Sequence, residues 1–224
     1  MTTKAIKFIG TAAIMMGIAS LALPAQGQSF GDLAGALTKK KESSLDWGSV
    51  SGESDTALIN LYQGQGKLSA AVADLADVVS LSEQAAELRA GAIAVEACGA
   101  SSCPEYSEVT AQDAQVQEQV LRELEAQAGS LSTEQKEKAG DALQKYVLGG
   151  IQFAKGVSDA KRLGQLAADA PMLQKPKFIG LIKAVPTAAK GVGNLVQTAP
   201  KLFRLASAAD IKEPEGADAM MGAL

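Results

Sequence analysis

The stretch STEQKEKAGDALQKYVLGGIQFAKGVSDAK, residues 132–161, decides the fold class. It opens on a capping box, because Gln135 follows the Ser132 hydroxyl by three residues. Small and apolar residues then recur at alternating spacings of three and four, which marks one face of an α-helix. The row comprises Ala139, Leu143, Val147, Gly150, Ala154, Val157 and Lys161. The pattern predicts a long helix over 133–169.

The same rhythm predicts long helices on the N-terminal side of this stretch. Residues 55–97 carry the row Leu58, Leu61, Gln65, Leu68, Val72, Leu75 and Val79, with Gln65 as its polar member. Residues 105–128 carry Val109, Val116, Val120, Leu121 and Leu124, after a proline that suits a first helical turn. We therefore expect one helix over each range.

A proline-containing helix is predicted on the C-terminal side. Residues 176–199 follow the three-four rhythm, and we expect their apolar row to pack into the bundle. That row comprises Phe178, Ile182, Val185, Ala189, Val192, Val196 and Ala199. Pro186 predicts a bend inside it, and Pro200 predicts a break followed by a short helix over 201–209.

These elements predict an all-α antiparallel bundle of about four long helices, the last broken by Pro186 and Pro200. A short N-terminal helix around 30–37 is added to it. Gly149, Gly150 and Gly156 disfavour a helix interior, so we expect another helix to approach closely there. An elongated helical hairpin that completes its core by dimerising is the alternative.

The N-terminus has the pattern of a secretory signal peptide over residues 1–27. Lys4 and Lys7 precede an apolar run from Phe8 to Leu23, and small residues precede a cleavage point between Gly27 and Gln28. The run is short for a membrane span, although an uncleaved anchor is the alternative. We expect a periplasmic or secreted protein.

Four segments are therefore predicted along the 224 residues. They are the signal peptide over 1–27, a short helix and Ser/Gly-rich linker over 28–53, the helical bundle over 54–209, and a flexible acidic tail over 210–224. Trp47, inside the linker, is expected to pack back on the bundle.

The two cysteines of the chain are expected to form a structural disulfide. Cys98 and Cys103 stand in the turn CGASSCP, and an exported protein meets an oxidising compartment. The short loop would stabilise a local turn by about 2 kcal/mol. The spacing does not match a thioredoxin-type redox pair.

Composition excludes several kinds of catalytic site. The chain has no histidine, so Ser-His-Asp and Cys-His sites and histidine metal centres are excluded. Two cysteines cannot form a Cys₄ cluster. Glu123 and Glu125, like other acidic pairs, fit a solvated helix surface. We expect a protein that is not an enzyme and has no metal, cofactor or nucleic-acid partner.

Charge is distributed unevenly along the chain. Residues 28–170 hold 12 Lys and Arg against 21 Asp and Glu, whereas residues 171–209 hold no acid. Six cations lie in that acid-free stretch, namely Lys175, Lys177, Lys183, Lys190, Lys201 and Arg204. They form a candidate membrane or partner surface. Docking of the basic segment on the acidic body of its own bundle is the alternative.

The sequence thus predicts an exported, non-catalytic helical-bundle protein that acts through protein–protein contacts in the cell envelope. Its partner would be an envelope protein or a second copy of itself. The alternative hypothesis is lipid or membrane-surface binding through the basic amphipathic segment 172–205.

Overall fold

The structure is a computed structural model that describes residues 45–224. The predicted signal peptide and the short helix predicted around 30–37 lie outside the described residues. The described elements are α2 (Trp47–Val78), α3 (Ser82–Ala97), α4 (Tyr106–Gln127), α5 (Thr133–Ala168), the 3₁₀ helix η1 (Lys175–Phe178), α6 (Ile179–Ala208) and α7 (Ala217–Ala223). Every one of them is helical, which confirms the prediction of an all-α chain.

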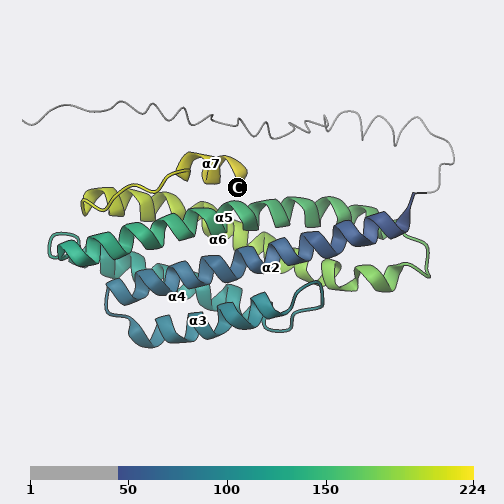
Figure 1. The fold of residues 1–224 in the computed structure, drawn as a ribbon, viewed down its shortest axis with the longest axis horizontal. Helices are drawn as coiled ribbons and strands as arrows, with labels where there is room; N and C mark the ends of the chain where they lie inside the picture. Colours follow the sequence, from purple (N-terminus) through teal and green to yellow (C-terminus); the bar gives the residue numbers. More distant parts are fainter. Residues whose placement is uncertain (1–44) are drawn as a thin grey trace, which may run out of the picture. The chain divides into compact units, whose positions relative to one another are not determined.

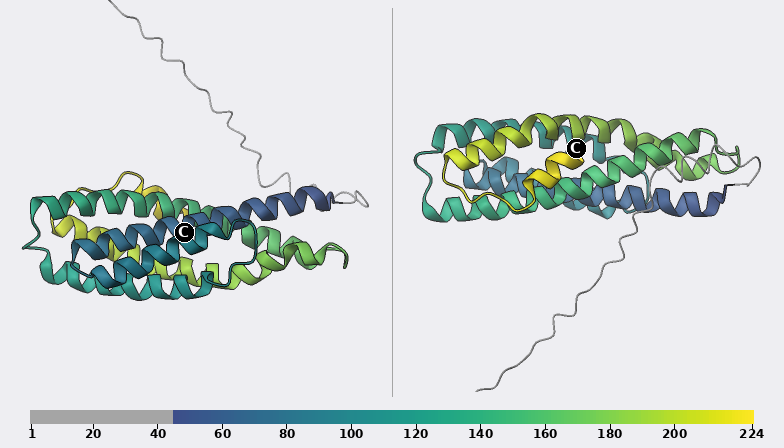
Figure 2. Two further views of the ribbon diagram at one scale, coloured as in Figure 1. Left: turned by 60° about the horizontal axis from the view of Figure 1, so that its bottom comes forward. Right: turned by 90° about the horizontal axis from the view of Figure 1, so that it is seen from above.

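The long helices lie side by side, as Figures 1 and 2 show. Contacts between α2 and α5 pair Gly64 with Phe153 and Leu61 with Gly156, so these two helices run antiparallel. Hydrogen bonds join Gln65 to Asp113 and Gln117 to Thr198, and α2, α4 and α6 run in the same direction. The chain therefore reverses direction at each connection from α2 to α6.

The helix predicted over 55–97 is two helices. Ser80 adopts a left-handed φ of 68°, and the Leu81 N–H donates to the Ala76 carbonyl at 2.8 Å, which closes a Schellman-type turn. The chain then folds back, and α3 packs along α2. The prediction was wrong here because the apolar spacing continues across a turn that contains no glycine or proline.

Both ends of the described region are more helical than the sequence predicts. The predicted linker over 28–53 contains the start of α2, where the Asp46 carboxylate accepts a hydrogen bond from the Gly48 N–H. Trp47 packs edge-on against Phe178, with ring centroids 6.1 Å apart. In the predicted flexible tail, α7 buries Met220 completely. Tertiary contacts thus order segments whose composition resembles that of loops.

Other boundaries agree with the sequence analysis. α4 and α5 end within one residue of the predicted ranges, which is the usual uncertainty of helix ends. The capping box at the start of α5 is confirmed, since the Gln135 N–H donates to the Ser132 hydroxyl at 3.2 Å. In return, the Gln135 side-chain oxygen accepts a hydrogen bond from the Ser132 N–H at 3.0 Å.

Close contact between α2 and α5 explains the helix-interior glycines. A methyl group at Gly156 would lie 2.6 Å from the Leu61 backbone nitrogen, and one at Gly149 would lie 2.9 Å from that of Leu68. Gly64 faces the Phe153 backbone at a similar separation. The predicted close approach of another helix is confirmed at these positions. Gly150 has a different neighbour, the Met220 side chain of α7.

The prediction that Pro186 and Pro200 break the last helix is wrong. α6 runs uninterrupted from Ile179 to Ala208 through both prolines. A proline removes the hydrogen bond to the carbonyl four residues before it, here Ile182 and Val196. Both residues and both prolines are exposed, so water can solvate the freed carbonyls. The buried face of α6 keeps its packing.

Candidate functional site

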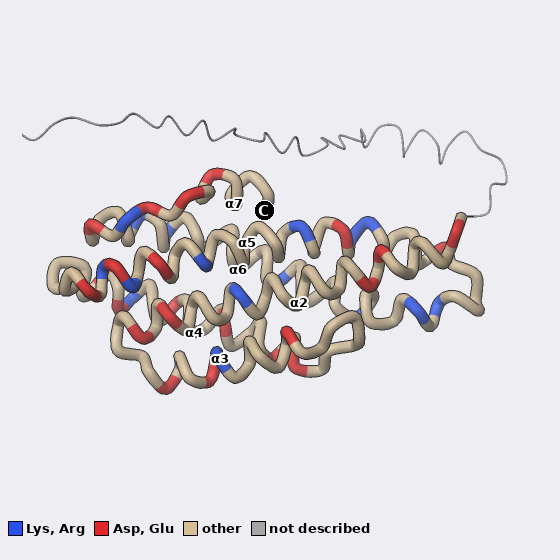
Figure 3. The backbone as a smooth tube through the Cα atoms, viewed as in Figure 1, with Lys and Arg blue, Asp and Glu red and all other residues tan. Residues whose placement is uncertain are grey.

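The six predicted surface cations all lie on the outside of the described bundle. Lys175 and Lys177 belong to η1, and the other four lie along α6. In Figure 3 the segment after α5 carries blue positions and no red position until the chain approaches α7. None of the six forms an ion pair within residues 45–224. No carboxylate of the described residues therefore forms a direct ion pair with any of these cations.

Apolar side chains stand exposed among these cations. Met172 and Leu173, in the turn before η1, are 87% and 91% exposed. Ile179, Ile182 and Val196 are each about half exposed on α6. Large apolar residues in a protruding turn beside lysines combine the two attractions that hold peripheral proteins on lipid. We call the exposed apolar residues and the six cations the basic face.

The predicted buried row is wrong except for Phe178 and Ala199, which are fully buried. Ile182 and Val196 point outward, and Val185 and Val192 are half-buried. The helix buries the row shifted by one residue: Leu181, Ala184, Ala188, Gly191, Leu195, Thr198, Ala199, Leu202 and Ala206. A methyl group at Gly191 would lie 2.8 Å from the Phe153 ring, so close packing selects the row with small residues.

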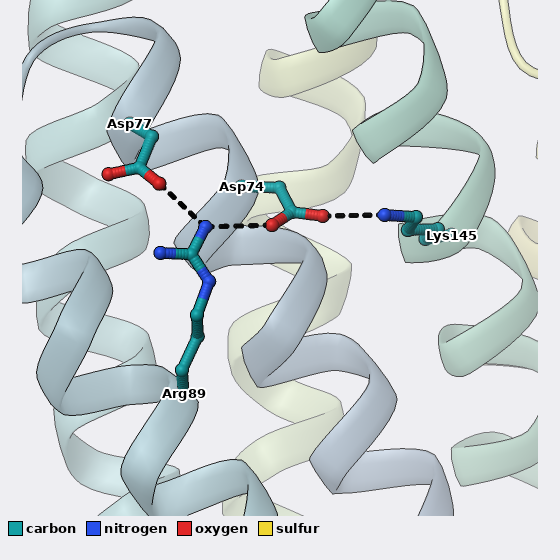
Figure 4. Close-up of polar contacts among 4 residues, drawn as sticks. All are labelled: Asp74, Asp77, Arg89 and Lys145. Carbon is teal, nitrogen blue, oxygen red and sulfur yellow. Dashed lines mark hydrogen bonds and ion pairs between the residues drawn. The ribbon is translucent and has the colours of Figure 1, made fainter.

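Unlike the cations of the basic face, the cations between α2, α3 and α5 form ion pairs. The Arg89 guanidinium donates to Asp74 at 2.8 Å and to Asp77 at 2.6 Å, and the Lys145 ammonium donates to Asp74 at 2.7 Å (Figure 4). Burial would raise the Asp74 pKa, but the bonds from Arg89 and Lys145 hold it below its usual value. The charges here satisfy one another and join three helices.

This cluster lines an open groove of about 380 Å³. Asp74 and Asp77 belong to the lining of this groove. Their charges are paired to Arg89 and Lys145. The groove is best described as a structural ion-pair network.

A buried polar network lies between α2, α4, α5 and α6. The Gln65 amide donates to the Asp113 carboxylate at 2.8 Å, and the hydroxyls of Tyr146 and Thr198 both donate to Gln117. Burial raises the pKa of Asp113 to about 6, although hydrogen bonds from Gln117, Gln65 and Ser69 oppose the shift. One carboxylate oxygen of Asp113 has no hydrogen-bond partner among the described residues.

Sequence reasoning identified Gln65 as a polar member of its row but missed Asp113. The signal was present, since Asp113 occupies the seam position between Val109 and Val116 at helical spacing. A charged residue at such a position means either that this side of the helix faces solvent or that the charge makes a polar contact inside the core. Asp113 makes a polar contact inside the core.

Cys98 and Cys103 lie at disulfide distance, with their Cα atoms 5.5 Å apart. The Glu105 carboxylate lies 3.8 Å and 3.7 Å from the two sulfur atoms. The pair closes the turn between α3 and α4, as predicted, and leaves the first turn of α4 beside the start of α6.

Comparison with known proteins gives no family model that matches the chain, and no similar curated protein or solved structure. Among the helices described over 45–224, none combines the length and apolar character needed to cross a bilayer.

Proposed function

We propose that the protein binds anionic membrane surfaces peripherally through its basic face. The observation that carries the proposal is the set of six exposed cations without a carboxylate partner in the described bundle. Each cation held near an anionic lipid surface contributes about 1 kcal/mol, so several together support reversible, salt-sensitive binding.

The exposed apolar turn would set the orientation of the protein on the membrane. Met172 and Leu173 can enter the headgroup region while Lys175 and Lys177 contact lipid phosphates next to them. Ile179 and Ile182 follow on the first turn of α6. A protruding turn of two large apolar residues fits a deformable lipid surface better than a flat protein surface, which offers no pocket for it.

Flotation of the full-length protein with lipid vesicles tests the proposal. We expect co-flotation with vesicles rich in phosphatidylglycerol, release at high salt, and weak binding to pure phosphatidylcholine. The double variant Lys175→Glu/Lys177→Glu should lose most of the binding. Because every variant keeps residues 8–23, a difference between variants isolates the contribution of the basic face.

The matched control reverses two exposed cations outside the basic face. Lys67→Glu/Lys155→Glu changes the net charge by the same amount and should float like the wild type. Equal loss in both double variants would mean that net charge alone governs binding, and no loss in either would refute the role of the basic face.

The preferred sequence hypothesis, contact with an envelope protein or self-association, stays a prediction, as do export and the lack of catalysis. Light scattering on the full-length protein measures self-association directly. A stable dimer that buries Leu173 would favour the protein-contact hypothesis over the lipid-surface hypothesis.

A further inference from the structure

Two cysteines and a carboxylate meet in the turn between α3 and α4. Cys98 follows the last residue of α3, Cys103 lies five residues later, and Glu105 directly precedes α4. One carboxylate oxygen of Glu105 lies 3.8 Å from the Cys98 sulfur and 3.7 Å from the Cys103 sulfur. The two sulfur atoms and a carboxylate oxygen thus all lie within 4.8 Å of one another.

A disulfide does not account for the position of the Glu105 carboxylate. The sulfur atoms of a disulfide carry no hydrogen, so they cannot donate to a carboxylate. Within residues 45–224, Glu105 forms no ion pair, and its carboxylate has no other hydrogen-bond partner. The contact becomes favourable when the pair is reduced, because thiols can donate to the carboxylate and a metal cation can bind all three groups.

The distances match those between the ligands of a tetrahedral metal site. Zn²⁺ binds thiolate sulfur at about 2.3 Å and carboxylate oxygen at about 2.0–2.2 Å, which places the oxygen about 3.6 Å from each sulfur. The observed separations of 3.7 Å and 3.8 Å therefore require little movement of Glu105. Two thiolate sulfurs on the same ion lie about 3.8 Å apart. The 5.5 Å between the Cα atoms of Cys98 and Cys103 permits that separation.

The turn gives an ion access from solvent. Both cysteines are partly exposed, and Glu105 is exposed. Cys103 also lines an open hollow of about 270 Å³, together with Lys183. Lys183 forms no ion pair with the described residues, so its charge can offset the net negative charge of two thiolates and a carboxylate around a divalent ion. Water can occupy the fourth ligand position of the ion.

We infer that reduction of the Cys98–Cys103 pair creates a binding site for a thiophilic divalent metal ion such as Zn²⁺, with the two thiolates and the Glu105 carboxylate as ligands. Thiolate ligands select Zn²⁺ over Mg²⁺ and Ca²⁺. The expectation of no metal considered histidine centres and a Cys₄ cluster, and this site needs neither. It does not depend on the membrane contact proposed above, since its three ligands lie outside the basic face.

The chain alternates between a disulfide and a metal complex. A dithiol reductant supplies two electrons and two protons, which convert the sulfur–sulfur bond into two thiols, and the reductant leaves as its own disulfide. The metal ion then displaces the two thiol protons into solvent and forms two metal–sulfur bonds and one metal–oxygen bond. The oxidised pair has no thiolate and cannot bind the ion.

Spectroscopic titration of the full-length protein tests the site. The protein is reduced with dithiothreitol, desalted under nitrogen to remove the reductant, and titrated with Cd²⁺, whose thiolate complexes absorb ultraviolet light. We expect one Cd²⁺ per chain, displacement of Cd²⁺ by Zn²⁺ but not by Mg²⁺, and no thiolate absorption in the oxidised protein. The absence of saturable absorption in the reduced protein, or one ion shared by two chains, would overturn the inference.

Three variants assign the ligands. Cys103→Ser removes one thiolate and should raise the dissociation constant for Cd²⁺ by about a hundredfold or more. Glu105→Gln keeps both thiolates and their absorption but should raise the dissociation constant by about tenfold. Glu108→Gln, which changes an exposed acid in the first turn of α4, is the matched control and should bind like the wild type. Equal affinity of Glu105→Gln and the wild type would overturn the three-ligand site.

Thermal melting followed by circular dichroism gives a second readout and verifies that each variant is folded. A ligand that binds the folded chain raises its melting temperature, so Zn²⁺ should raise that of the reduced wild type and leave that of the oxidised protein unchanged. The same response to Zn²⁺ in both redox states would contradict the inference. Cys103→Ser should lose metal binding without changing flotation on phosphatidylglycerol vesicles, which separates this site from the basic face.

Discussion

The two sides of α6 differ in what their residues contribute. The inner row packs small residues and leucines against α4 and α5, and it contains no charge. The outer side carries four of the six cations of the basic face, together with half-exposed Ile182 and Val196. Stability therefore resides in the inner row, whereas the outer side is free to serve binding. The hydrophobicity of a residue alone does not tell which side it occupies.

The sharpest test of this comparison replaces two adjacent residues of α6. Leu195 is 2% exposed and borders the same small void as Asp113, whereas Val196 is 45% exposed. We expect Leu195→Asp to lower the free energy of unfolding by about 3–5 kcal/mol, because it buries a second charge. Val196→Asp should change it by less than about 0.5 kcal/mol. Urea denaturation measures both, and equal losses would contradict the assignment of faces.

The next test asks whether the interior is optimised for stability throughout. Asp113 has a folded-state pKa of about 6, above its unfolded value, so folding favours its protonated form. The wild type should therefore lose stability as the pH rises through this range. Relative to Asp113→Asn, the loss between pH 4 and pH 7 should be on the order of 3 kcal/mol. Parallel pH profiles of the two proteins would show that Asp113 is not buried as described.

Two glycines, one packed against a neighbouring helix backbone and one facing open space, test the same contrast between inner and outer positions. A methyl group at Gly156 meets the α2 backbone, whereas one at Gly193 meets nothing within 4 Å. Gly156→Ala should destabilise the fold by about 1–3 kcal/mol, as overpacking does. Gly193→Ala should stabilise it by about 0.5–1 kcal/mol, because it raises helix propensity. Melting temperatures that move in the same direction would contradict the close α2–α5 contact.

The smallest effect is expected for a single cation of the basic face. Lys190→Gln removes an exposed charge that has no ion-pair partner among the described residues. The free energy of unfolding should change by less than about 0.5 kcal/mol. Lys145→Gln is the matched control, since it breaks the 2.7 Å pair with Asp74 and should destabilise more. A larger loss for Lys190→Gln than for Lys145→Gln would mean that the basic face is part of the stabilising structure.

The sequence by itself determined the helical character of the bundle segments, although not that of the first turns of α2 or of α7, because apolar spacing and caps are local properties. The capping box of α5 and the glycine row facing α2 could be predicted for this reason. The acid-free stretch was also visible in the sequence, and the structure exposes all six of its cations. The candidate basic face was therefore predicted residue by residue on its charged side.

Only the tertiary structure decided the turn at Ser80, the row of residues that α6 buries and the continuity of α6 through two prolines. Each depends on a neighbour that is distant in sequence. Gly191 against Phe153 selects the inner row, and exposure of Ile182 and Val196 lets water reach the carbonyls that the prolines leave unbonded.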